Sequence, residues 1–73
     1  MKTLVLHNDT KNSFEHVIIS LVDICGHEVD QAEQCAYITN YTGKCKIKTS
    51  NDIMDLLDIN KRLVAEGLDV ELV

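Results

Sequence analysis

Residues 14–25 read FEHVIISLVDIC and carry the clearest periodic pattern in the chain. Apolar side chains recur there at i, i+3, i+4, i+7, i+8 and i+11, which is one stripe on a helix with 3.6 residues per turn. The stripe consists of Phe14, Val17, Ile18, Leu21, Val22 and Cys25. Asn12 stands three residues before Glu15, as in a capping box, and Gly26 follows where a left-handed residue commonly ends a helix. The pattern predicts an amphipathic helix with one face buried against other elements.

Three short segments alternate in the way that is typical of strands. Residues 2–7 place Leu4 and Leu6 on one side of the chain, residues 44–48 alternate lysine with apolar side chains, and residues 68–72 alternate apolar with acidic side chains. The lysine side of the second segment and the acidic side of the third carry opposite charges. We therefore expect these two strands to be neighbours in a sheet.

Two further helices are predicted from caps and apolar periodicity. The second helix begins near Glu28 and ends at Gly43. Its apolar positions are Val29, Ala32, Cys35, Ala36 and Ile38. The third helix follows a capping pair of Thr49 and Asp52 and ends at Gly67. Its stripe consists of Ile53, Leu56, Leu57, Asn60, Leu63 and Val64.

These elements define the expected fold class, which is α/β (α+β) with the order β-α-α-β-α-β. Because each helix carries a single apolar stripe, we expect a three-stranded antiparallel sheet with the three helices on one face and water on the other. A chain of 73 residues has room for one hydrophobic core. We therefore expect residues 1–73 to form a single small domain.

Charge and composition exclude several classes of function. Twelve Asp and Glu against seven Lys and Arg give a net charge of −5, which would repel a phosphate backbone, so no nucleic acid partner is expected. No apolar run approaches the ~20 residues that cross a bilayer, so no membrane partner is expected either. The start of the chain leads into no signal-peptide core. We expect a cytoplasmic protein.

The residues that usually carry chemistry are sparse. Cys25, Cys35 and Cys45 are odd in number and lie among apolar neighbours, which predicts reduced and mostly buried thiols. The absence of any C-x-x-C or H-x-x-x-H pair predicts no metal site. Without a Gly-rich phosphate loop or a nucleophile elbow, we expect neither a cofactor nor an enzyme.

One polar loop stands out as a candidate binding site. Asn8, Asp9 and Thr10 end the first strand, and Phe14 and Val17 follow on the next helix, so polar and apolar groups can meet an amphiphilic ligand there. The alternative interpretation is that the loop only makes a turn and a helix cap. Asn40, near the end of the second helix, equally suits helix termination.

The chain resembles the ClpS adaptor family over nearly all of its length. The resemblance rests on LVLHND at residues 4–9, on Glu15 and Val17, on YTGK at residues 41–44, and on the last helix and strand. ClpS proteins bind substrates with a bulky hydrophobic N-terminal residue (an N-degron) and deliver them to a Clp AAA+ unfoldase and protease. The resemblance implies three antiparallel strands with three helices and no catalysis. It implies two partners, the N-domain of a Clp-type unfoldase and the N-terminal segments of substrate proteins.

The resemblance also implies a site for the ligand's α-ammonium group. In the family an Asn-Asp-Asp triplet and a histidine at the end of the second helix hold this group, because an ammonium offers donors and needs acceptors. Asn8 and Asp9 match the first two members, Thr10 stands in the third position, and Asn40 stands in the position of the histidine. The amine-binding residues expected here are therefore Asn8, Asp9 and Asn40.

The family's pocket for the first side chain falls on Phe14, Val17, Ala36 and Thr39. Most members carry methionine at the positions of Phe14 and Ala36, so the resemblance implies a pocket of a different shape here. Plain core packing is the alternative interpretation of Phe14 and Val17. The first strand begins almost at Met1, without the N-terminal arm that engages the unfoldase, so we expect docking with weak or absent delivery.

A different class of function fits the same fold. A non-catalytic interaction domain with a degenerate N-degron pocket could dock factors through a helix face, like the C-terminal domain of the ribosomal stalk protein.

Overall fold

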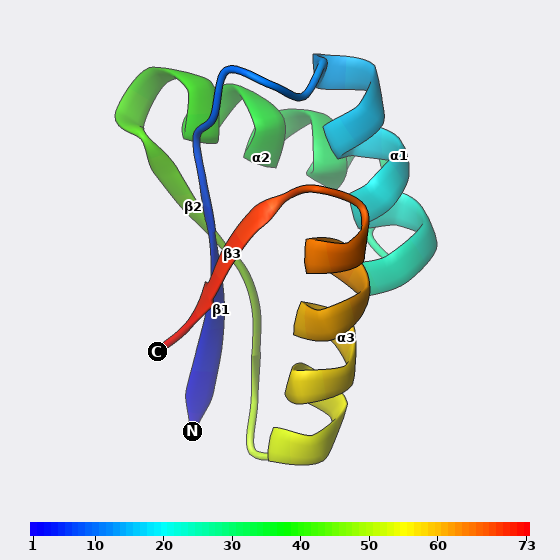
Figure 1. Cartoon of the computed structure of the whole chain (residues 1–73), viewed down its shortest axis with the longest axis vertical. Coiled ribbons are helices and arrows are strands. Elements are labelled where there is room, and N and C mark those ends of the chain that lie inside the picture. Colours follow the sequence, from blue (N-terminus) through cyan, green and yellow to red (C-terminus); the bar gives the residue numbers. More distant parts are fainter.

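Six elements follow one another in the expected order in a computed structural model that describes residues 1–73 (Figure 1). They are β1 (Lys2–His7), α1 (Phe14–Cys25), α2 (Val29–Thr42), β2 (Lys44–Ser50), α3 (Ile53–Ala65) and β3 (Asp69–Leu72). The three strands form one antiparallel sheet. The expected α+β class and the β-α-α-β-α-β order are confirmed.

The order of strands in the sheet is β2-β1-β3, so the expected contact between β2 and β3 is wrong. β1 is the strand best suited to the centre because it is apolar on both faces: Leu4 and Leu6 are buried on one, and Val5 is 7% exposed on the other. Val5 pairs with Lys46 of β2 on one side and with Glu71 of β3 on the other. The lysine side chains of β2 and the acidic side chains of β3 therefore lie on opposite edges of the sheet.

The core lies between one face of the sheet and the helices. Its ten buried apolar residues are Leu4, Leu6, Leu21, Ala32, Cys35, Ile47, Leu56, Ile59, Leu63 and Leu68. α3 packs against all three strands, and α1 packs against both α2 and α3. α2 packs against β2 at the edge of the sheet, which brings the end of α2 close to the end of β1.

All three expected helix stripes are partly wrong, and on α1 the exception is Phe14, which is exposed. α3 buries Leu56, Ile59 and Leu63, while Leu57 and Val64 of the expected stripe are exposed. α2 buries Ala32, Cys35, Ala36 and Thr39, and its larger residues Val29 and Ile38 are exposed. Both helices carry apolar residues on more than one face, so periodicity alone does not select the face that meets the sheet.

Both predicted capping pairs are also misplaced. Ser13, not Asn12, caps α1, and its Oγ accepts a hydrogen bond from the His16 amide at 3.1 Å. Asp52 alone caps α3. The hydroxyl of Thr49 is unavailable because β2 extends to Ser50, and Thr49 Oγ1 lies 3.1 Å from the Oγ1 of Thr3 on the paired strand.

A bulge in β2 is held by a buried histidine. Leu4 pairs with Lys48 and Val5 with Lys46, so Ile47 is an extra residue without a direct partner in β1. The Nε2–H of His27, from the turn between α1 and α2, donates to the carbonyl oxygen of Ile47 at 2.8 Å. The histidine therefore supplies the hydrogen bond that the extra residue lacks in the sheet.

The bulge also turns Lys48 away from the solvated side on which the sequence pattern had put all the lysines of β2. Lys48 pairs with the inward-facing Leu4, and its Nζ lies 3.7 Å from Asp55 Oδ2 in the first turn of α3. An extra residue shifts the alternation of a strand by one, so the side chains beyond it change face.

We predict that replacing His27 by alanine lowers the free energy of unfolding by ~1–3 kcal/mol, because the buried carbonyl of Ile47 loses its donor. Urea denaturation of the wild type and H27A measures this loss. His16→Ala is a matched control, since His16 donates to the Glu66 carbonyl at an exposed site where water can replace it. Equal losses in the two variants would contradict a special role for His27.

Candidate functional site

A cavity of about 100 Å³ opens where β1 ends and the chain turns into α1. Its walls contain all seven residues that the sequence analysis named as ligand-binding. The wall consists of Leu6, His7, Asn8, Asp9, Asn12, Phe14, Val17, Ala36, Thr39 and Asn40. They come from the end of β1, the loop that follows it, the first turns of α1 and the second half of α2. The fold thus gathers residues that lie more than thirty positions apart.

One half of the cavity is lined mainly by apolar groups, some of which are buried and some of which are exposed. Ala36 and Thr39 of α2 are buried, and the Thr39 hydroxyl donates back to the Cys35 carbonyl at 2.8 Å within the helix. Val17 is partly buried and Phe14 is 41% exposed. The α2 residues therefore form the floor of the apolar half, and Phe14 forms its rim.

The polar half joins two separate segments of the chain. The backbone N–H of Asn8 donates to the Gly43 carbonyl at 2.9 Å, which pins the loop after β1 to the end of α2. Gly43 takes a left-handed conformation with φ of 95°, so a glycine is needed at this tight turn. The side chains of Asn8 and Asn40 are exposed and form no hydrogen bond within the chain. Both amides are free to meet a ligand.

Asp9 organises the loop itself. Its Oδ1 accepts from the backbone N–H groups of Lys11 at 2.8 Å and Asn12 at 2.9 Å, and its Oδ2 accepts from the Asn12 side-chain amide at 2.9 Å. Burial would raise the pKa of Asp9, but these hydrogen bonds and the charge of Lys11 outweigh it and lower the pKa below 3.8. A carboxylate has about four acceptor positions, so Oδ2 keeps one for a ligand.

Three wall residues were missed by the sequence analysis: Leu6, His7 and Asn12. Asn12, expected to cap α1, instead uses its side-chain amide to bond Asp9 and the Gly67 carbonyl, the latter at 2.9 Å. The spacing Asp-x-x-Asn is a signal for such a side-chain-closed loop and could have identified it. The bond to Gly67 also ties the cavity wall to the turn between α3 and β3.

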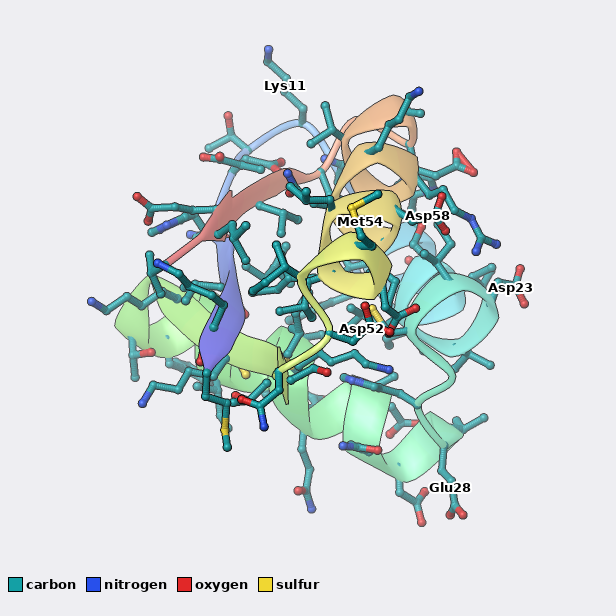
Figure 2. The ribbon with its side chains drawn as sticks, turned by 90° about the horizontal axis from the view of Figure 1, so that it is seen from below. Lys11, Asp23, Glu28, Asp52, Met54 and Asp58 are labelled. Atoms are coloured by element: carbon teal, nitrogen blue, oxygen red, sulfur yellow. The ribbon has the colours of Figure 1, made fainter.

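Two loop residues take no part in the wall. Thr10, which stands in the third position of the family's triplet, is exposed and does not line the cavity. Figure 2 shows Lys11 projecting from the tip of the loop away from the body of the molecule. Asp9 is therefore the one carboxylate in the cavity wall.

A second hollow, of about 610 Å³, lies on the outer face of the sheet and beside α2. Val5 and Val73 contribute apolar surface, and Lys44, Lys46 and Glu71 contribute charge. It contains none of the residues named from the sequence as ligand-binding.

The thiols are less uniformly buried than expected. Cys35 is buried, whereas Cys25 and Cys45 are partly exposed. Burial raises the pKa of Cys25 to about 11, despite the opposing charges of Lys48 and Arg62. Burial also raises the pKa of Cys35, and the neighbouring thiol of Cys45 raises it further.

No three His, Cys, Asp or Glu side chains are grouped to hold a metal ion. None of the helices has the length and apolar character needed to span a bilayer.

We predict that Asp9→Ala lowers the free energy of unfolding by ~1 kcal/mol at neutral pH, as the loss of a helix cap does. Because folding lowers the pKa of Asp9 below 3.8, its stabilising effect is complete well above that pH and is lost as pH falls through the folded pKa. Denaturation of both proteins from pH 7 to pH 3 should show the two curves converging. Asp23→Ala, at an exposed site on α1 that Figure 2 shows pointing outward, is the control. A difference that stays constant with pH would contradict the role of the charge.

We predict that the native thiols react slowly with a disulfide reagent at pH 8, because the reactive species is the thiolate and burial disfavours it. Cys45 should react before Cys35 because it is partly exposed, and before Cys25 because burial raises the pKa of the Cys25 thiol to about 11. Thiol titration with and without denaturant, followed by mapping of the labelled peptide, measures the order. Rapid labelling of Cys35 in the folded protein would contradict it.

The family model described as "ATP-dependent Clp protease adaptor protein ClpS" matches residues 1–57. No curated protein matches the chain. The family match covers more than three quarters of the 73 residues and includes every residue of the cavity wall. Members of this family are non-catalytic adaptors that interact with a Clp AAA+ protease. The chain belongs to the ClpS family.

Proposed function

We propose that this protein binds the N-terminal residue of a substrate polypeptide in the cavity at the end of β1 and presents that substrate to a Clp AAA+ unfoldase. The observation that carries the proposal is the meeting of an apolar floor with three hydrogen-bond acceptors in one small cavity. A polypeptide N-terminus has the matching chemistry, since an ammonium group and a side chain leave the same carbon atom. The chain itself catalyses no reaction in this scheme.

The amine would be held by Asn8, Asn40 and Asp9. An ammonium has three N–H donors, and the three acceptors would be the Oδ1 atoms of Asn8 and Asn40 and the remaining acceptor position on Asp9 Oδ2. The amide groups come from two segments that the bond between Asn8 and Gly43 fixes together. All three hydrogen bonds would be charge-assisted because the donor is a cation, and the bond to Asp9 would in addition join two opposite charges.

The apolar half would select the first side chain by size. A benzene molecule occupies an apolar cavity of about 150 Å³, whereas this cavity measures about 100 Å³. Phe14 adds a ring at the rim, and Ala36 fills little of the floor because its side chain is a single methyl group. We therefore propose that leucine is the preferred first residue and that tryptophan is too large.

A second candidate function rests on the exposed apolar face of α3. Ile53, Met54, Leu57 and Val64 are all exposed, and Figure 2 shows Met54 projecting from the start of this helix. Such a face can lie in the groove of a partner protein. In this reading the chain is an interaction domain that docks through α3, and the cavity at the end of β1 has no ligand.

We predict that a peptide with N-terminal leucine binds and that acetylation of its amine weakens binding roughly ten- to a hundredfold, because a charge-assisted hydrogen bond of ~1.5–3 kcal/mol is lost. The same peptide with N-terminal tryptophan should bind more weakly. Fluorescence anisotropy with labelled peptides measures all three affinities. Equal binding of the free and acetylated peptides, or of neither, would reject the proposal and favour docking through α3.

The amide groups can be tested separately from stability. Asn8→Ala and Asn40→Ala should each weaken the leucine peptide by about tenfold while leaving the melting temperature nearly unchanged, because both side chains are exposed and unbonded. Asn51→Ala, an exposed asparagine between β2 and α3, is the matched control and should bind normally. Normal binding by both cavity variants would contradict their role as acceptors.

A further inference from the structure

Every aromatic residue of the chain lies on the surface. The sequence contains one Phe, two Tyr and no Trp. Phe14 is 41% exposed, Tyr37 54% and Tyr41 80%. Aromatic side chains usually contribute large apolar areas to a core or an interface, so their complete absence from this core calls for a surface role.

These three residues form one continuous group, here called the aromatic row. The ring centres of Phe14 and Tyr37 are 5.2 Å apart with planes tilted by 54°. The rings of Tyr37 and Tyr41 are 6.5 Å apart and nearly parallel, at 14°. The row therefore runs from the start of α1 onto the exposed side of α2, and each of its three residues keeps a large exposed fraction.

The aromatic row begins at the cavity. Phe14 is both its first member and a part of the cavity wall. Tyr37 and Tyr41 directly follow Ala36 and Asn40 of the wall, so each lies about 100° further round α2 than its neighbour. A chain that leaves the cavity across its Phe14 side meets Tyr37 next.

We propose that the aromatic row binds the third residue of the peptide whose first residue occupies the cavity, and that it prefers a planar side chain there, an Arg guanidinium or an aromatic ring. This inference rests on the proposed function. An extended chain advances ~3.3 Å per residue with alternating side chains. The third residue thus faces the same surface as the first, ~6.6 Å further along, which is comparable with the spacing between the rings.

Arginine suits the aromatic row by charge as well as by shape. A guanidinium stacks on an aromatic face and adds a cation–π attraction. Glu33 is exposed one helical turn before Tyr37, on the same side of α2, and the chain carries a net charge of −5. Both features favour a cation over an acidic side chain at this place.

The test uses peptides that begin Leu-Ala-Xaa, where Xaa is Ala, Lys, Arg, Phe or Asp, titrated against the intact protein by fluorescence anisotropy. Arg and Phe at the third position should bind about two- to fivefold more tightly than Ala, the range expected for stacking at an exposed ring. Tyr37→Ala and Tyr41→Ala should reduce this gain without changing the affinity for the Leu-Ala-Ala peptide. Ile38→Ala, an exposed apolar residue on the same helix, is the matched control and should keep the gain.

The possible outcomes separate the two claims. If the leucine peptide binds through its free amine but Arg and Phe give no gain, or the gain persists in Tyr37→Ala, the inference is overturned and the proposed function stands. An equal gain from Lys and Arg, or a gain that appears at the second position instead, also overturns it. If no peptide binds through its amine, both claims fail. A dimer in sedimentation that Tyr37→Ala dissociates would show that the row binds a second copy of the chain instead, which overturns the inference.

Discussion

The burial of β1 on both faces is the constraint on which the rest of the structure depends. Leu4 and Leu6 lie against the helices, and Val5 is covered on the other side between the side chains of its neighbours Lys46 and Glu71. A strand of this kind must be central, so β2 and β3 flank it. The chain that leaves β1 therefore starts from the central strand and runs past α2 to α1 (Figure 1), and this segment lines the cavity.

Residues of the cavity wall also form the hydrogen bonds that hold the neighbouring turns together. Asn8 holds the turn after α2, Asn12 holds the turn after α3, and Asp9 closes the loop that carries both. In a domain of this size, stabilised by ~4–11 kcal/mol in total, a few such hydrogen bonds are a substantial share of stability. Asp9 consequently serves the fold first, whereas Asn8 and Asn40 have side chains with no structural partner.

Local patterns were sufficient to predict the order of the elements, whereas the convergence of Phe14, Val17, Ala36 and Thr39 on one cavity was implied by the resemblance to the ClpS family. Helix periodicity and glycine C-caps act over a few residues and leave a readable trace in the sequence. The strand order, the bulge at Ile47 and the caps at Ser13 and Asp52 were not predicted. Each depends on which of several possible partners a group contacts, and some of those partners are distant in the sequence. The Thr49 hydroxyl, for example, contacts the Thr3 hydroxyl across the sheet.

The separation of charged rows by β1 gives the outer face of the sheet an electric polarity. Lys44 and Lys46 lie along one edge, and Asp69 and Glu71 lie along the other, with the width of one strand between them. A charged surface that approaches this face experiences a torque as well as an attraction, because its field acts oppositely on the two edges. The field of the approaching surface therefore rotates the molecule about an axis parallel to the strands. This orienting effect weakens as added salt shortens the range of the field.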